Sequence, residues 1–303
     1  MQWQGRQGSE NVEDRRGQGG SSGGFSGNFG GNLGGLLGGK GCGCGGGIGT
    51  IIVILVLWLM GVNPLTLLQL SSELPTQQTQ TGEYQSSAEE DSMMRFSEVV
   101  LKLTEDVWTD IFNQMGKTYR KPTLVFYTQG TQSGCGVADA AVGPFYCSAD
   151  EKIYLDLSFF NQMATQFHAG GDFAYAYVIA HEVGHHVQKL LGTLDQVNAQ
   201  MARSSKTVAN ELSVRLELQA DFYAGVWANH TDSQFHILDP GDIEAALNAA
   251  SQIGDDTLQK ETQGYIQPDS FTHGTSKQRY TWFNKGYKTG DISYGDTFSA
   301  NPL

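Results

Sequence analysis

The distribution of glycine constrains where this 303-residue chain can fold. Residues 1–47 hold 19 of the 39 glycines, and most of the other residues in that stretch are polar or charged. A segment of this composition buries too little apolar surface to offset the entropy lost when its backbone is ordered. We therefore expect residues 1–47 to form a disordered tail, with the globular part of the chain beginning later.

An uncharged apolar stretch follows this tail. Residues 48–62 read IGTIIVILVLWLMGV, and weaker apolar character continues to Leu70, for a total of 23 residues. A helix needs about 20 apolar residues to cross a bilayer. We expect residues 48–70 to be a transmembrane signal anchor, because a cleaved signal peptide would have a much shorter leading segment and an A-x-A site. The alternative is a buried core helix.

The charges that flank the apolar stretch are unevenly distributed. No Lys or Arg occurs between positions 63 and 94, where five acidic residues lie, whereas basic residues precede the stretch. The positive-inside rule then places the N-terminus in the cytoplasm and the chain after about residue 70 in the periplasm or outside the cell. The preceding basic residues are Arg6, Arg15, Arg16 and Lys40.

The remaining chain divides into a linker and one domain. Residues 71–88 are rich in Gln, Ser and Thr and predict a linker, and residues 89–303 have an ordinary globular composition. The formal net charge of −13 comes with no basic stripe, so we expect no nucleic-acid partner. Cys135 and Cys147 lie on the expected exported side, where a disulfide is plausible. Cys42 and Cys44 precede the anchor and form only a weak metal or acylation signal.

The periodicity of the domain predicts an α+β fold. Residues 123–128 and 153–157 have strand character, residues 130–147 a loop composition, and the stretch after Gly254 is polar and irregular until about residue 277. The helical segments predict a mostly helical domain whose small sheet packs on the helix over residues 172–191. The other helices are expected over residues 96–115, 158–167, 195–230 (one long or broken helix), 242–253 and 277–287.

The helix over residues 172–191 carries a strong metal-site pattern. His181 and His185 are four positions apart, so both imidazoles can reach one metal ion from the same helix face. Glu182 lies beside them and can act on a water molecule at that metal. Neutral nitrogen ligands with an adjacent acid–base group are typical of catalytic zinc. The alternative is a pair of buried core histidines.

A second acidic pair is the candidate for the missing ligand. Glu217 and Asp221 are four positions apart on a predicted helix and are surrounded by apolar residues, unlike a solvated helix face. This suits one carboxylate that binds the metal and one that orients a histidine ligand. Glu211 is the main competitor for the ligand role, but no acid follows it four residues later.

These motifs together resemble a known family. H-E-x-x-H followed by Glu-x-x-x-Asp is the gluzincin pattern, and the whole chain resembles the YpfJ-type family of neutral zinc metallopeptidases, which are bacterial single-pass membrane proteins. The segments that carry the likeness are MQWQGRQGSENVEDRRG, the apolar stretch, SGCG through PFYCSADEKIYLDLSFF, AHEVGHHVQ, ELQADFYAGVWA and SFTHGTSKQRYTWFNKGY. The likeness implies a zincin-like domain attached to the bacterial inner membrane.

The resemblance also implies roles for individual residues. His181, His185 and Glu217 would bind one Zn2+ per chain, Glu182 would be the general base, and Asp221 would orient a ligand, most simply His181. His273 is our candidate for the oxyanion donor, with Tyr223 and Arg279 as further candidates. His186, next to the second ligand, is expected to be structural. The strand at residues 153–157 is either a substrate-binding edge strand or an ordinary sheet strand.

Three functions are compatible with this sequence. The first is a membrane-anchored zinc metallopeptidase that acts on a peptide or protein substrate, with Glu182 as the base. The second is a catalytically silent binding or scaffold protein of the cell envelope that keeps the peptidase fold. The third is a zinc-dependent hydrolase of non-peptide bonds. The intact Glu182 favours an enzyme, and the sequence leaves the substrate and the oligomeric state open.

Overall fold

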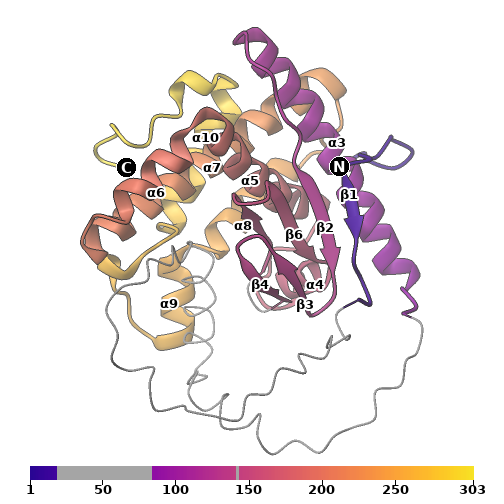
Figure 1. Cartoon of the computed structure of the whole chain (residues 1–303), viewed down its shortest axis with the longest axis horizontal. Helices are drawn as coiled ribbons and strands as arrows, with labels where there is room; N and C mark the ends of the chain where they lie inside the picture. The colour runs from indigo at the N-terminus through magenta and orange to yellow at the C-terminus, as the bar shows by residue number, and fades with distance from the viewer. Residues whose placement is uncertain (19–83, 141–142) are drawn as a thin grey trace, which may run out of the picture.

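The computed structural model describes residues 1–18, 84–140 and 143–303, and within them the fold is α+β and mostly helical (Figure 1). The strands are β1 (Val12–Asp14), β2 (Thr123–Tyr127), β3 (Gly130–Ser133), β4 (Gly136–Asp139), β5 (Phe145–Cys147) and β6 (Lys152–Asp156). The helices are α3 (Ala88–Gln114), α4 (Ser158–Thr165), α5 (Asp172–Leu191), α6 (Thr193–Met201), α7 (Lys206–Phe235), α8 (Asp242–Gln252), α9 (Asp255–Gln263) and α10 (Ser276–Thr289), with the 3-10 turns η2 (Pro268–Ser270) and η3 (Ile292–Tyr294).

The main sheet has the strand order β1-β2-β6-β5. Strands β1, β2 and β6 are parallel, and β5 runs antiparallel to β6 at the edge. Side chains alternate between the faces: Leu124 and Phe126 of β2 join the core beneath the helices, whereas Val125 and Tyr127 face a smaller cluster with Ala138 of the β3–β4 hairpin. Both strands expected from the sequence, at residues 123–128 and 153–157, are confirmed.

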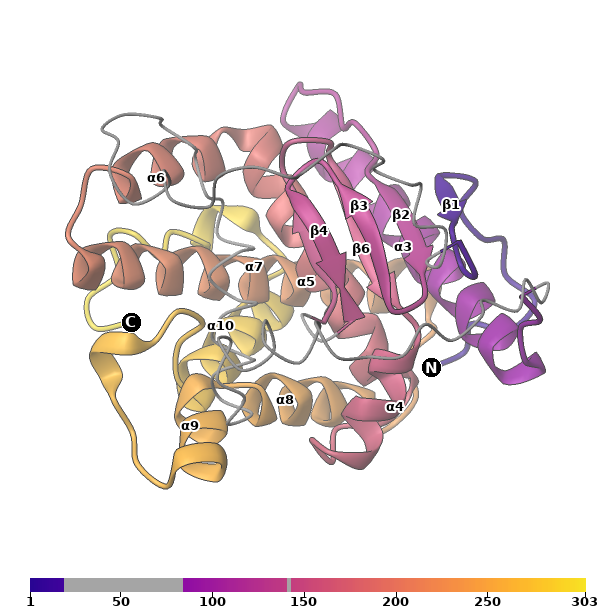
Figure 2. The same ribbon diagram turned by 60° about the horizontal axis from the view of Figure 1, so that its bottom comes forward.

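Helices α5 and α7 form the centre of the domain. Helix α5 packs against α3, α7 and α8, and α7 lies along α10 (Figure 2). Glycines allow the α7–α10 approach, because a Cβ atom at Gly225 would lie 2.1 Å from the carbonyl oxygen of Phe283, and one at Gly286 would lie 2.0 Å from that of Phe222. The long segment expected over residues 195–230 is broken into α6 and α7, where Ser205 caps the second helix.

The first 18 residues are folded, so the expectation of a disordered tail over residues 1–47 is wrong for them. Val12–Asp14 pairs with Leu124–Phe126 at the edge of the sheet, where Figure 1 shows the strand in indigo beside α3. The composition argument failed because it averaged over the whole stretch, and only 3 of its 19 glycines lie in residues 1–18. Residues 19–47 lie outside the described part of the chain.

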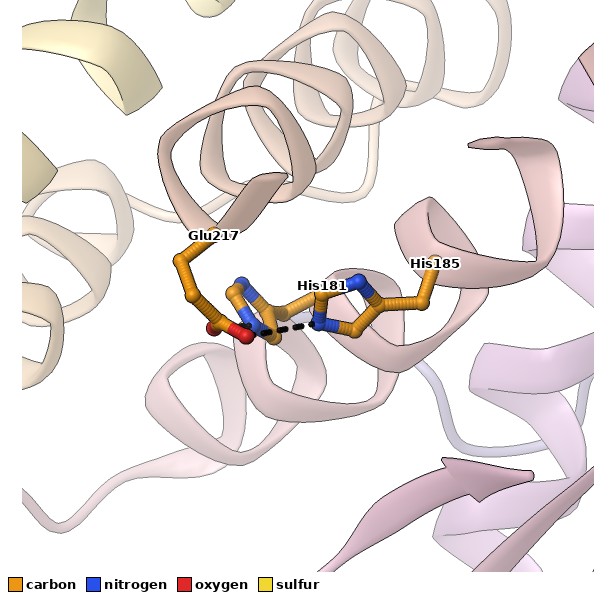
Figure 3. Close-up of side chains that lie close together, drawn as sticks. All are labelled: His181, His185 and Glu217. Atoms are coloured by element: carbon orange, nitrogen blue, oxygen red, sulfur yellow. Dashed lines mark hydrogen bonds and ion pairs between the residues drawn. The ribbon is translucent and has the colours of Figure 1, made fainter. Parts of the chain in front are cut away.

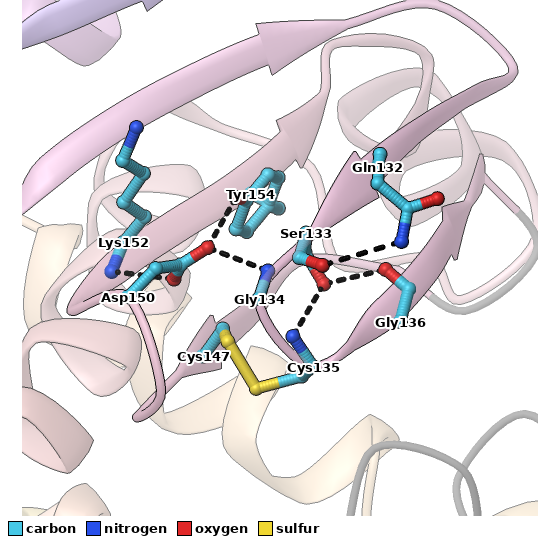
Figure 4. Close-up of a disulfide and its surroundings, with 9 residues drawn as sticks. All are labelled: Gln132, Ser133, Gly134, Cys135, Gly136, Cys147, Asp150, Lys152 and Tyr154. Carbon is cyan, nitrogen blue, oxygen red and sulfur yellow. Dashed lines mark hydrogen bonds between the residues drawn. A yellow bond between two sulfur atoms is a disulfide. The ribbon is translucent and has the colours of Figure 1, made fainter.

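Residues 130–147 hold more structure than the expected loop. They form the β3–β4 hairpin and the edge strand β5, and a disulfide joins Cys135 to Cys147, as expected (Figure 4). The Oδ2 atom of Asp150 accepts hydrogen bonds from the Gly134 amide and the Tyr154 hydroxyl, both at 2.7 Å. The Gly134 bond and the disulfide join residues 16 and 12 positions apart, and such contacts stabilise strands that a Gly- and Ser-rich sequence does not predict. Likewise, α9 lies in the stretch expected to be irregular.

Two parts of the predicted organisation fall outside the described residues. These are the apolar stretch at residues 48–70 and the linker up to residue 83. Among the helices that the structure does describe, none has the length and apolar character needed to cross a bilayer.

Candidate metal centre

Helix α5 fixes the positions of His181, Glu182 and His185. The helix begins after Gly171, which has a φ of 120°, and ends at Gly192, whose left-handed conformation (φ 84°) stops it. Most of its side chains are buried, so the apolar core holds the helix on nearly all sides. His181 and Glu182 are themselves buried, and His185 is partly exposed. The predicted pattern therefore lies on a rigid, central helix.

A close helix crossing brings the second motif to the first. At Gly184, between the two histidines, a Cβ atom would lie 2.9 Å from the carbonyl oxygen and 3.0 Å from the Cα atom of Ala220 on α7. Only glycine permits this approach without displacing a backbone. Because Ala220 lies between Glu217 and Asp221, the crossing places both carboxylates against the histidines of α5.

The expected three ligands converge on one point (Figure 3). His181 Nε2 lies 3.1 Å from Glu217 Oε2, and His185 Nε2 lies 3.5 Å from Glu217 Oε1. One ligand atom from each residue lies within 4.8 Å of the others. Two imidazole nitrogens and a carboxylate oxygen with this spacing fit a tetrahedral zinc ion whose fourth position is open. Glu211, the competing candidate, is exposed at the start of α7.

The Nδ1 atom of each histidine is hydrogen-bonded to a neighbouring side chain. His181 Nδ1 lies 2.8 Å from Asp221 Oδ1, so the predicted orienting role of Asp221 toward His181 agrees with the geometry. His185 Nδ1 lies 2.9 Å from Gln188 Oε1, while the amide of Gln188 donates to the Leu216 carbonyl at 2.7 Å. These bonds direct both Nε2 atoms toward Glu217. Sequence reasoning missed Gln188, although its position three residues after His185 on the same helix pointed to it.

A buried network surrounds Asp221. Its carboxylate accepts hydrogen bonds from the Tyr177 hydroxyl at 2.5 Å and from Arg279 Nε at 2.8 Å. Burial raises the pKa of Asp221, but the charges of Arg279 and His181 outweigh this and hold it well below its usual range. Burial lowers the pKa of His181, yet Asp221 and Glu217 together raise it to about 10. Without metal this histidine is therefore in its protonated, charged form, and a metal that binds at Nε2 must displace the proton on that nitrogen.

Glu182 has the environment of a general base. Its side chain is buried in the same cavity, and that burial raises its pKa. The charges of His181 and His185 and a backbone hydrogen bond from Tyr146 act in the opposite direction. Tyr146 belongs to β5, so the edge of the sheet contacts the catalytic candidate directly.

The structure also places His273 in this cavity and pairs it with Asp255. His273 Nδ1 lies 3.1 Å from Asp255 Oδ1, and Asp255 Oδ2 accepts the His273 backbone amide at 2.6 Å. Burial lowers the pKa of His273, but the charge and hydrogen bonds of Asp255 raise it overall. Asp255 was not identified from the sequence, because it is separated from His273 by 18 positions and begins the unpredicted helix α9.

The other oxyanion candidates have different surroundings. Tyr223 packs edge-on against Trp108 at 5.5 Å, outside the residues that line the cavity. Arg279 reaches the cavity, but its guanidinium is bound to Asp221. His186 is structural, as expected, because it lies between the Arg120 carbonyl at 2.6 Å and the Tyr146 hydroxyl at 3.0 Å.

The strand at residues 153–157 is an ordinary sheet strand. The structure places β6 between β2 and β5, so the substrate-edge interpretation of this strand is wrong. The edge strand next to β6 is β5, which lies beside α5. Its residues Phe145 and Tyr146 line a cavity of about 280 Å³ that also contains the three metal-ligand candidates, Glu182 and His273. The cavity wall is mainly apolar and includes Phe159, Val178, Leu194 and Leu216.

The comparisons with known proteins identify the family of the chain. Residues 1–298 match the family described as "Putative neutral zinc metallopeptidase". The chain therefore belongs to this family, and the description supports a hydrolase at the level of class. No solved structure matches the chain.

The similar proteins come from several bacteria. The chain is 47% identical over 301 residues to "Uncharacterized protein YpfJ" of Escherichia coli K12, an alignment that covers 99% of this chain and 100% of the relative. It is 45% identical over 197 residues to "Uncharacterized protein Mb2605" of Mycobacterium bovis and to "Uncharacterized protein Rv2575" of Mycobacterium tuberculosis. Those alignments cover 61% of this chain and 65% of each relative.

Replacement of Glu217 tests the ligand set. We expect about one zinc per chain in the unaltered protein, because two histidines and one carboxylate fill three positions of a catalytic zinc site. Glu217→Ala should lose more affinity than the roughly 10–100-fold that a mutated outer partner costs. Glu211→Ala, exposed on the same helix, is the matched control and should keep its zinc. Metal content after dialysis and chelator competition measure both, and full retention by Glu217→Ala would exclude it as a ligand.

Replacement of Gly184 tests the helix crossing. Gly184→Ala should lose about 1–3 kcal/mol of unfolding free energy, because the added methyl group meets the α7 backbone. It should also weaken zinc binding by roughly 10–100-fold as Glu217 moves away from the histidines. Gly192→Ala is the control, because its Cβ meets nothing within 4 Å but its φ of 84° is strained. The control should lose stability in urea unfolding and keep its zinc affinity; equal zinc affinities in both variants would refute the crossing argument.

Proposed function

We propose that this protein is a zinc-dependent peptidase that hydrolyses peptide bonds of a peptide or protein substrate. The observation that carries the proposal is the convergence of His181, His185 and Glu217 in one cavity with the buried carboxylate of Glu182. The cavity brings together candidates for the metal ligands, the base and a further donor, which are the groups that metal-assisted hydrolysis requires. The family to which the chain belongs supports the same reaction class.

The ligand residues fit a zinc ion, and a bound zinc would supply a Lewis acid that polarises the carbonyl and increases the acidity of water. Glu182 then takes a proton from the attacking water and passes it to the nitrogen of the leaving amine. Its burial suits the first step, because a raised pKa makes the carboxylate a stronger base than an exposed glutamate.

His273 is placed to stabilise the developing oxyanion. Asp255 holds its Nδ1 atom and keeps the imidazole protonated to a higher pH than an isolated histidine, so Nε2 carries a proton that it can donate. The substrate backbone would lie along β5, which pairs only with β6 among the described strands of its sheet. The apolar cavity wall favours an apolar side chain beside the cleaved bond. We also propose that residues 48–70 attach the enzyme to a membrane.

Replacement of Glu182 separates catalysis from metal binding. Glu182→Gln keeps the size and burial of the side chain but cannot accept the proton, so hydrolysis should fall about 10²–10⁴-fold. Zinc content should remain at the unaltered level, because Glu182 is not a ligand. Turnover of a quenched-fluorescence peptide library and metal analysis measure the two quantities. Unchanged turnover would contradict the mechanism, and an unaltered protein that binds zinc but cleaves no peptide would favour the scaffold function.

The pairing of His273 with Asp255 predicts a pH dependence. The pKa of His273 is raised, so the protonated donor persists to a higher pH than in an isolated histidine and is lost as the pH rises through that raised value. Asp255→Asn removes the negative charge, and the alkaline limb of the kcat/KM profile should move to lower pH, toward the ordinary histidine range near 6.5. His273→Gln should lower activity about 10²–10³-fold and leave the residual activity without this limb. An alkaline limb that stays in place in Asp255→Asn would exclude this role.

A further inference from the structure

The N-terminal arm, residues 1–18, is part of the folded domain along its length. Near its start, the Trp3 ring packs edge-on against Phe96 at 5.4 Å, and its Nε1 atom donates to Asp172 Oδ2 at 2.8 Å. Asp172 is the first residue of α5, so this contact braces the helix that carries the metal-ligand candidates. Near its end, β1 completes one edge of the main sheet by pairing with β2.

The middle of the arm donates hydrogen bonds to a buried carboxylate. Glu105 on α3 is only 1% exposed, and its Oε1 atom accepts hydrogen bonds from Ser9 Oγ at 2.6 Å and Asn11 Nδ2 at 2.7 Å. Lys121 pairs with the other carboxylate oxygen at 3.2 Å. Without the arm, one oxygen of a buried carboxylate would lose both of these partners, which is costly in a protein interior. The arm therefore stabilises the domain through these contacts.

The end of the arm lies against the point where the described chain resumes. Arg16 pairs with Asp91 at 3.2 Å and with Glu90 at 3.5 Å, both in the first turn of α3, and its guanidinium lies 5.9 Å from the ring centre of Tyr84. A Cβ atom at Gly17 would lie 2.2 Å from the Cβ atom of Tyr84. The chain thus leaves the domain and returns to it at nearly the same place.

We propose that the arm and the rest of the domain lie on the same side of the membrane. A strand cannot pair with its sheet across a bilayer, so the opposite-side arrangement expected from the flanking charges is incompatible with β1 in the sheet. The number of crossings between residues 18 and 84 must then be even. Two crossings need about 40 apolar residues, and the sequence between residues 18 and 84 has one apolar stretch of 23 residues. The same-side arrangement therefore excludes a single bilayer crossing at residues 48–70.

The same-side arrangement is independent of the proposed peptidase activity. It depends on contacts of the described residues, and the family match that begins at residue 1 includes the arm. The disulfide between Cys135 and Cys147 would persist only in an oxidising compartment, so its presence indicates which side is shared.

Labelling of single cysteines in the full-length protein tests this proposal. The background carries Cys42→Ser and Cys44→Ser, so that only the introduced thiol and the disulfide pair remain. Gln7→Cys reports on the arm and Lys117→Cys on the body of the domain, and both positions are exposed. Intact spheroplasts are treated with a membrane-impermeant maleimide, with and without permeabilisation. The background protein alone is the control for any reactivity of Cys135 or Cys147.

The two cysteines should behave alike. Labelling of both in intact spheroplasts supports the proposal with the domain outside, and labelling of both only after permeabilisation supports it with the domain in the cytoplasm. Labelling of Lys117→Cys but not Gln7→Cys in intact spheroplasts, or the reverse, overturns it. Circular dichroism and the zinc content of each variant confirm that neither substitution unfolds the domain.

Discussion

The backbone contact between α5 and α7 at Gly184 is the constraint on which the site depends. The two histidines lie one turn apart on one helix, and the two acids lie one turn apart on the other, so each helix offers half of a metal centre. Only a close crossing joins the halves, and a side chain at position 184 would prevent it. The surrounding architecture maintains this contact, because α3, α8 and the sheet hold α5 while α10 holds α7 from the other side.

The buried charges extend this constraint to the end of the chain. Arg279 on α10 neutralises Asp221, which in turn orients His181, so the ligand geometry includes a residue 98 positions after the histidine (181 to 279). The α7–α10 contact through Gly225 and Gly286 brings this arginine into the interior. Paired in this way, the carboxylate and the guanidinium satisfy each other, whereas either alone would carry a large desolvation cost.

The sequence predicted the local features well and the long-range ones poorly. His181, Glu182, His185, Glu217 and Asp221 were found because helical spacing alone decides which side chains share a face. Asp255 was missed because no helical spacing predicts its contact with His273, whereas Gln188 was overlooked although it lies three residues after His185 on the same helix. The strand at residues 12–14 was missed because its pairing with β2 depends on tertiary structure, and the glycine-rich composition that follows obscured it. The β3–β4 hairpin pairs locally, and it was missed because its Gly-, Ser- and Thr-rich composition is also typical of a loop.

The position of β1 in the sheet has a consequence for the order in which the protein is made. Val12 pairs with Leu124, which is 112 positions further along the chain (12 to 124). The β1 segment is synthesised long before β2, so it is unpaired while residues 48–70 are being made. Pairings of such large sequence separation close slowly, and unpaired strands are prone to aggregation in the interval. The closure of the sheet at β1 is therefore a late event in the folding of this protein.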